Sequence, residues 1–259
     1  MNVINIICCY NEIEYLPKVV SYYQNEGVDI FIADNKSSDG SWEWINDNKL
    51  PCIQFDTNEC FDLKAQQAVR KTLADGRAEY DWIIYGDADE YIVCSKPLSE
   101  VFAFADDNKC NAIQMKSFDI YNTGERRDED ITHTYFYYKE RYNRFGGIER
   151  IHKNVKGVVY EADFIHVPNK KTCKVHDGNI LNYGCTKTKE QRLDVYKRRQ
   201  KSWDLGITPR AHGAHYEINT NRDWTWDKNE LDDMREHKDY KFIKPKVVDF
   251  ESIYSIINV

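Results

Sequence analysis

The chain has 259 residues, with 36 Lys and Arg against 43 Asp and Glu, so its formal net charge is −7. A chain of this length buries roughly three quarters of its unfolded surface and forms one large domain or two small ones, which excludes a miniprotein stapled by disulfides or metal. No run approaches the roughly 18 apolar residues that cross a bilayer, which excludes a membrane-spanning protein. The acidic balance also counts against generic nucleic-acid binding.

The eight cysteines are scattered and form no CxxC pair, which favours free thiols. The sequence opens directly into an apolar run at 3–9, without the features of a secretory signal. We therefore expect a reducing, cytoplasmic compartment.

Short β-rich runs alternate with helix-like segments through the first half of the chain. Asn11 is expected to cap the first helix and Gly27 to end it. From about residue 90 the pattern becomes less regular. The predicted strands are 3–9, 28–33, 52–55, 82–85 and 112–117, and the predicted helices are 12–25, 41–46, 62–75, 98–105 and 189–205. This alternation is typical of an α/β fold with an open, twisted, mostly parallel sheet flanked by helices.

Polar residues follow three of the predicted parallel strands. They are Tyr10 and Asn11, then Asp34 and Asn35, then the segment 87–89. Open α/β sheets bind ligands beyond the carboxyl ends of their strands, so these groups are expected to gather along one edge.

Asp87 and Asp89 flank one small residue after an apolar strand. If the chain stays extended, both carboxylates point to the same side. Two carboxylates facing one point are typical ligands of Mg²⁺ or Mn²⁺ held together with substrate phosphates. The alternative is an acidic pair that only solubilises a loop or caps a helix.

The stretches 6–12, 32–40 and 80–90 resemble, in the same order, three motifs of the family 2 glycosyltransferases, which have the GT-A fold. They correspond to the opening strand with its Tyr-Asn-Glu motif, the second strand with its acidic, Ser-rich turn, and the strand with the metal-binding DxD motif. The resemblance implies a single domain over 1–259. Its half 1–95 would bind a nucleotide sugar, and 96–259 would form an appended C-terminal acceptor-binding region.

The resemblance also implies roles for residues at the strand ends. Asp34 would accept a hydrogen bond from the nucleobase, and Tyr10 would pack near the base. Lys64 stands roughly where relatives place a polar or basic nucleotide contact, with Gln66 and Gln67 as alternatives.

In the same comparison, Asp89 would be the main anchor of Mn²⁺ or Mg²⁺, and Asp87 would bind the ribose or the metal. The ion would stabilise the negative charge on the departing diphosphate.

Further along, 150–154 and 160–167 resemble a bacterial branch of the family that includes lipopolysaccharide-core glucosyltransferases and peptide S-glycosyltransferases. His166 falls on a histidine of this branch and is a predicted metal ligand, with His176 as an alternative. Asn182 stands where the branch usually has another histidine.

The resemblance implies an inverting reaction, in which a carboxylate takes the proton of the acceptor. Glu149 and Asp177 are the predicted bases, because both lie in the region expected to cover the donor sugar. For each of them the competing interpretation is a surface carboxylate.

The segment Lys187 to Lys201 is rich in Lys and Arg. One interpretation is a solvated helix face. The other is a seat for a phosphorylated acceptor, or a peripheral contact with the acidic inner face of a membrane.

The sequence therefore predicts a metal-dependent, inverting glycosyltransferase that moves a sugar from a nucleotide sugar, with a UDP-sugar expected, to a glycan, lipid-linked or peptide acceptor. A nucleotidyltransferase is disfavoured because no Gly-rich basic loop follows the first strand. The alternatives are a non-catalytic domain that binds a nucleotide or glycan, and a glycosyltransferase that acts on nucleic acid.

Overall fold

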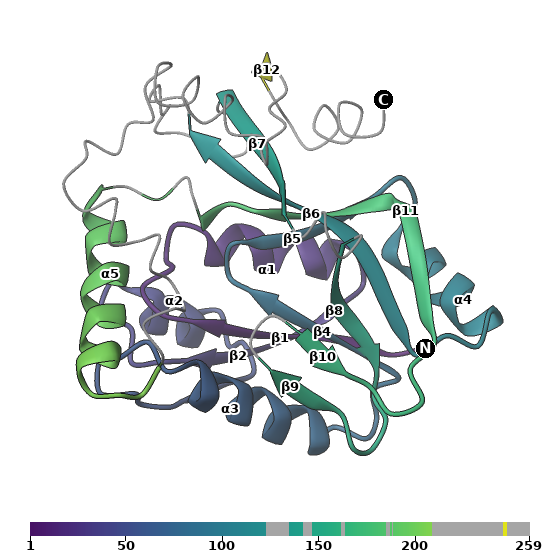
Figure 1. Cartoon of the computed structure of the whole chain (residues 1–259), viewed down its shortest axis with the longest axis horizontal. Helices are drawn as coiled ribbons and strands as arrows, with labels where there is room; N and C mark the ends of the chain where they lie inside the picture. The colour runs from purple at the N-terminus through teal and green to yellow at the C-terminus, as the bar shows by residue number, and fades with distance from the viewer. Residues whose placement is uncertain are drawn as a thin grey trace.

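The computed structural model describes residues 1–122, 135–141, 147–161, 164–184, 187, 189–208 and 246–247. Helices and strands alternate through the first half of the chain, as the sequence predicts (Figure 1). The elements there are β1 (Val3–Cys9), α1 (Leu16–Asn25), β2 (Asp29–Asp34), α2 (Ser41–Asp47), β3 (Cys52–Gln54), α3 (Leu63–Asp75), β4 (Trp82–Asp87), β5 (Glu90–Cys94) and α4 (Leu98–Asp107).

Strands dominate the second half. The elements are β6 (Ala112–Asn122), β7 (Tyr135–Arg141), β8 (Ile148–Lys153), β9 (Val159–Glu161), β10 (Phe164–His166), β11 (Thr172–Asn182), α5 (Lys189–Asp204) and β12 (Lys246–Val247).

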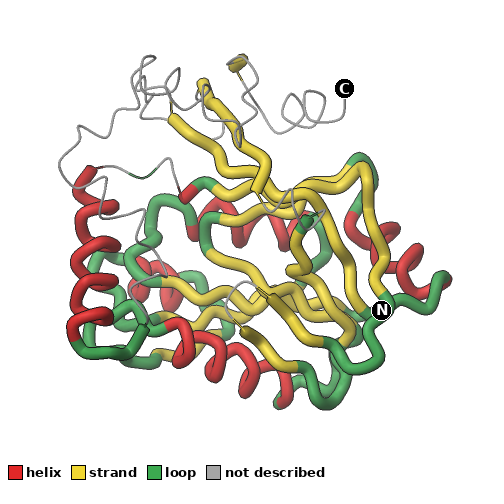
Figure 2. Tube along the Cα trace, viewed as in Figure 1, coloured by secondary structure: helices red, strands yellow, loops and turns green. Residues whose placement is uncertain are grey.

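The main sheet has the strand order β12-β7-β6-β8-β4-β1-β2-β3, and β11 pairs with both β5 and β6. Strands β1 to β4 run parallel, and β8 lies antiparallel to β4. Figure 2 shows helices on both sides of this sheet. The predicted α/β fold class is confirmed.

Both faces of the sheet are covered, because apolar side chains alternate along β1. Val3, Ile7 and Cys9 belong to a core shared with α1 and α4. Ile4, Ile6 and Cys8 point to the opposite face, where α3 packs. A strand buried on both faces is typical of a central parallel strand, and it fixes the direction in which the chain leaves β1.

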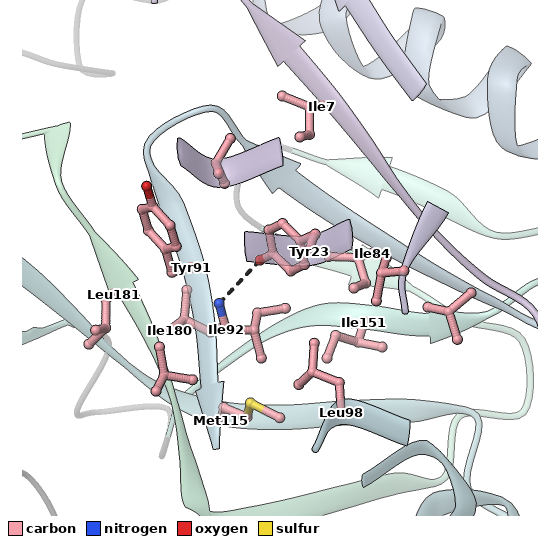
Figure 3. Packing of buried hydrophobic residues seen from close by; sticks show 14 of the residues in the cluster. Ile7, Tyr23, Ile84, Tyr91, Ile92, Leu98, Met115, Ile151, Ile180 and Leu181 are labelled. Atoms are coloured by element: carbon pink, nitrogen blue, oxygen red, sulfur yellow. Dashed lines mark hydrogen bonds between the residues drawn. The ribbon is translucent and has the colours of Figure 1, made fainter. Parts of the chain in front are cut away.

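Two tyrosines of α1 hold β5 in place. The hydroxyl of Tyr22 donates to the carbonyl of Ile92 at 2.6 Å. The Ile92 N–H in turn donates to the Tyr23 hydroxyl at 3.1 Å (Figure 3). The sequence prediction missed β5, because only two residues separate it from β4. Since β5 begins at Glu90, these bonds also fix the acidic turn before it.

The first helix begins at Leu16 and not at residue 12, so Asn11 is not its cap. Asn11 has a left-handed backbone with φ of 53°, and its Oδ1 accepts from the Ser38 N–H at 2.8 Å. This turn joins the ends of β1 and β2, and Pro17 then favours a helix start. The predicted end is confirmed, because Gly27 follows α1 with φ of 72°.

The described cysteines are all free thiols, as predicted. Among the residues that the structure describes, no helix is both long and apolar enough to cross a bilayer.

Candidate active site

The three groups of polar residues meet at one edge of the sheet, as the sequence predicts. In the strand register, Cys8 lies beside Asp87 and Cys9 lies beside Asp34. The carboxyl ends of β1, β2 and β4 therefore face the same side. We call the side chains that gather there the strand-end site.

Asp34 ends β2 and is fully buried. Its Oδ2 accepts from the Ser37 N–H and from Gln54 Nε2, both at 3.1 Å. The Cys9 thiol contacts the other carboxylate oxygen at 3.5 Å. In this state Asp34 organises the turn after β2, and its contact with a nucleobase stays a prediction.

Tyr10 follows β1, and helix α5 covers one face of its ring. The Arg198 guanidinium lies 3.3 Å from the ring centroid and donates to the Cys60 carbonyl at 3.2 Å. Arg198 is buried, although it lies in a stretch that could have formed a solvated face. The ring predicted to pack near the base therefore stacks with a cation supplied from 188 positions further along the chain.

Lys64 is exposed in the first turn of α3, while Gln67 in the next turn is buried. The residue of α3 that reaches the strand-end site is Arg70. Its Nη2 donates to the Gly86 carbonyl at 2.7 Å and to Asp87 Oδ1. Sequence reasoning missed Arg70, although it follows Gln67 by three positions and so shares its helix face.

Asp87 is half-exposed and lies between two arginines. Arg70 hydrogen-bonds one carboxylate oxygen, and Arg150 Nη2 lies 3.8 Å from the other. Burial raises the pKa of Asp87, but the charges of Arg70 and Arg150 outweigh burial and hold this pKa below its usual value. Asp87 is therefore ionised at neutral pH.

The guanidinium of Arg70 packs on a column of aromatic rings. Its guanidinium lies 4.1 Å from the centroid of the Tyr85 ring, and Tyr85 stacks on Tyr160 with centroids 5.1 Å apart. The Tyr160 hydroxyl lies 2.7 Å from His152 Nε2. This packing fixes the direction in which Arg70 meets Asp87.

Asp89 does not continue the line of β4, because the strand ends at Asp87 and the chain turns before β5. The two carboxylates therefore do not share one face by strand alternation, and they have different partners. Asp89 is buried, and its Oδ2 lies 3.0 Å from Lys187 Nζ. Lys187 also donates to Glu12 Oε1, so one ammonium joins two carboxylates.

Glu12 and Lys187 are both largely buried, and their ionisation is linked. Burial raises the pKa of Glu12 to about 7, although Lys187 acts in the opposite direction. Burial lowers the pKa of Lys187, but Asp89 and Glu12 outweigh it and hold this pKa well above the usual value. Lys187 is therefore a permanent cation of the strand-end site.

Glu90 completes the acidic group. Its Oε1 accepts from Arg150 Nη2 and from Asn182 Nδ2, each at 3.0 Å. The other end of Asn182 is also used, since its Oδ1 accepts from the Gly184 N–H at 2.9 Å. Asn182 thus orients Glu90 and the chain after β11.

These side chains do not fit a divalent ion. Asp87 pairs with Arg70, and the Asp89 oxygen nearest the site pairs with Lys187. A divalent ion there would have to displace these basic groups from the carboxylate oxygens, and the Lys187 ammonium would repel it. No group of three or more His, Cys, Asp or Glu among the described residues is arranged to hold a metal. Mn²⁺ or Mg²⁺ stays a sequence-based prediction.

Three predicted residues are not brought to the strand-end site. Glu149 alternates with Arg150 along β8 and points the other way, where it accepts from Lys170 and Thr172 at 2.9 Å. Asp177 accepts from Ser95, beyond the far end of β5. Five positions of β11 separate Asp177 from Asn182, a span of roughly 16 Å at strand rise.

His166 is the third. On β10 its neighbours Ile165 and Val167 are buried, so alternation turns His166 to solvent. There its Nε2 lies 3.2 Å from Glu161 of the same hairpin. His176, the alternative ligand, is exposed on β11.

The basic segment of α5 uses much of its charge within the protein. Besides Arg198, the Arg199 guanidinium lies 3.9 Å from the Phe61 ring centroid, and Lys201 donates to the Asn58 carbonyl at 2.7 Å. These contacts anchor α5 across the carboxyl ends of the parallel strands (Figure 1). Arg198 and Arg199 thus pack within the protein, whereas Lys201 stays exposed to solvent.

The family model for "Glycosyl transferase family 2" matches residues 5–163, which include every strand end of the site. The chain belongs to glycosyl transferase family 2. It is therefore a glycosyltransferase, an enzyme that takes a sugar from a donor to an acceptor. No curated protein matches the chain.

Two solved structures are similar to this family 2 chain over much of its length. A glucose-1-phosphate thymidylyltransferase from Bacillus anthracis, in complex with sucrose, is 10% identical with a TM-score of 0.31, and the match covers 100% of this chain and 94% of that one. A mannose-1-phosphate geranyltransferase from Thermus thermophilus is 10% identical with a TM-score of 0.32, and the match covers 84% of this chain and 67% of that one. Similarity at this level adds nothing to the family assignment.

Proposed function

We propose that this chain is an inverting glycosyltransferase that transfers a sugar from a nucleotide sugar, with a UDP-sugar expected, to a glycan, lipid-linked or peptide acceptor. The observation that carries the proposal is the meeting of Asp34, Asp87 and Asp89 at the carboxyl ends of two parallel strands, β2 and β4, inside the region that the family model matches. Ligands of open α/β sheets bind at this edge.

In the proposed reaction, the bond between the anomeric carbon and the β-phosphate oxygen breaks, and its electron pair leaves with the nucleoside diphosphate. The acceptor oxygen bonds to the anomeric carbon from the opposite side, and the acceptor's proton passes to a carboxylate. Asp34 and Tyr10, at neighbouring strand ends, are the residues proposed to contact the nucleoside. Arginine and lysine side chains near Asp87 and Asp89 face the developing charge, where preorganised cations lower the barrier.

The test is release of sugar from UDP-, GDP-, CDP- and TDP-sugars by the full chain, because many donors hydrolyse slowly without an acceptor. We expect one nucleotide to be preferred and Asp89→Ala to lower the rate by about 10²–10³-fold, the usual effect of removing one preorganised group at a reacting charge. The measurement is chromatography of the released nucleoside diphosphate.

Asp177→Asn is the matched control, since it changes a carboxylate that the structure keeps away from the strand-end site. We expect its rate to stay near that of the wild type, whereas a large loss would restore Asp177 as the base. If no donor is hydrolysed and none raises the melting temperature, the chain is a non-catalytic relative and the proposal fails.

A further inference from the structure

Lys187 contacts Asp89, the carboxylate at which the sequence predicts a metal ion. Its Nζ lies 3.0 Å from Asp89 Oδ2 and donates to Glu12, and its side chain is 11% exposed. Lysine is rarely buried to this extent unless it is paired, so the ion pairs with Glu12 and Asp89 are what hold the Lys187 ammonium in this buried position.

Other contacts show that the site is built around protein cations. Asp87 and Glu90 both face arginines, and Arg150 lies near both of them. Asn182 stands at the position where the resemblance led us to expect a histidine. Both ends of its side-chain amide already make hydrogen bonds within the protein. The side chains that would complete a metal shell are thus paired with basic or amide groups.

The segment after β11 brings Lys187 to this place. Tyr183 N–H donates to the Asp89 carbonyl at 2.8 Å, and Gly184 follows directly against the Asp89 carboxylate. Arg198 of α5 reaches Tyr10 at the neighbouring strand end. One stretch of the second half therefore supplies a cation to each of two strand ends of the first half.

We propose that Lys187 is the cation that binds the donor's diphosphate in this enzyme and takes the place of a divalent metal. The proposal rests on the proposed function, since it assigns a role within the same donor site. On donor binding, the ammonium would exchange part of its contact with Glu12 and Asp89 for phosphate oxygens, and the two carboxylates would keep it oriented.

The experiment measures binding of UDP, GDP, CDP and TDP to the full chain by calorimetry, once in EDTA and once in millimolar Mn²⁺. We expect at least one nucleotide to bind in EDTA with a Kd within about threefold of its value in Mn²⁺. Lys187→Ala should weaken that binding by at least about tenfold, and Lys187→Arg, which keeps the charge, by less. Lys174→Ala, at an exposed lysine of β11, is the matched control and should bind as the wild type does.

Each further outcome has one meaning. Nucleotide binding that requires Mn²⁺, or binding in EDTA that Lys187→Ala leaves unchanged, overturns the role of Lys187 and leaves the proposed function standing. Absence of binding under both conditions overturns the proposed function and this inference together. The wild-type comparison in EDTA and Mn²⁺ decides the question of the metal even if Lys187→Ala does not fold.

Discussion

Gly184 shows how little space surrounds the acidic side chains. A Cβ at this position would lie 2.9 Å from Asn182 Oδ1, which real Cβ atoms essentially never show, and 3.1 Å from Asp89 Oδ2, which is tighter than nine in ten real Cβ contacts. Only glycine lets the chain pass between Asn182 and Asp89 without moving them.

We therefore expect Gly184→Ala to displace Asp89 and to lower the rate of donor hydrolysis about tenfold, which corresponds to about 1.4 kcal/mol of transition-state stabilisation. The melting temperature should change little, because Gly184 lies at the site and outside the apolar core. Gly76→Ala is the control, since a Cβ there would make an ordinary contact of 3.4 Å. Equal rates for both variants would show that Asp89 tolerates the displacement.

At this scale the sequence identifies acidic residues better than their partners. Asp34, Asp87 and Asp89 could be placed together because each follows a parallel strand, and strand ends meet by topology. Lys187 could not, because 175 positions separate it from Glu12 and no periodicity links the two. Glu149 and Asp177 are predicted as bases only from the region of the chain in which they lie. The alternation of β8 and the length of β11 place both carboxylates away from the strand-end site.

Helix α5 is held to the body of the protein mainly by polar and aromatic contacts. Phe61 N–H donates to the Arg198 carbonyl at 3.2 Å, and the Arg198 side chain stacks on Tyr10. Contacts of this kind resemble those of a docked segment more than those of a core helix.

We expect Arg198→Ala to remove the stack and one hydrogen bond, at a cost of about 1–2 kcal/mol in the free energy of unfolding. The melting temperature should fall by about 3–6 °C on that basis. Lys197→Ala changes the exposed neighbouring residue and should leave the melting temperature unchanged. An unaltered melting temperature in Arg198→Ala would mean that α5 docks through its other contacts.

Elements were predictable where local patterns decide them. The alternating first half follows from apolar periodicity. The helix predicted at 62–75 forms at Leu63–Asp75, where Asp62 is the cap and accepts from the Ala65 N–H at 2.9 Å. Strand β5 escaped prediction because only two residues separate it from β4 and because its partner, residues 178–182 of β11, lies far along the chain. The start of α1 was wrong because Asn11 serves the neighbouring turn instead of the helix.

The stability of the whole molecule is expected to depend on pH through His152. Its ring is buried against Tyr160, and burial lowers its pKa to about 4 from the usual value of 6.5. The folded state therefore favours the neutral imidazole. The stability that depends on the neutral ring is fully present above about pH 6.5, the pKa of histidine in the unfolded chain. As the pH falls from about 6.5 toward 4, the free energy of unfolding decreases by up to about 3 kcal/mol.

Urea unfolding at about pH 7.5 and about pH 5 measures this dependence. The wild type should lose about 2 kcal/mol more between these two pH values than His152→Gln, which keeps a hydrogen-bonding group but does not titrate. His176→Gln, at an exposed histidine, should keep the wild-type difference. If His152→Gln shows the same pH dependence as the wild type, protonation of this ring does not limit stability.

The bond between Lys187 and Glu12 has a consequence for how this protein can be cut or recombined. The family match ends at residue 163, so a fragment trimmed to that boundary would keep every acidic strand end and lose the ammonium that balances two of them. Likewise, a chimera that takes its N-terminal half from one relative and its C-terminal half from another would need to keep Glu12 and Lys187 together.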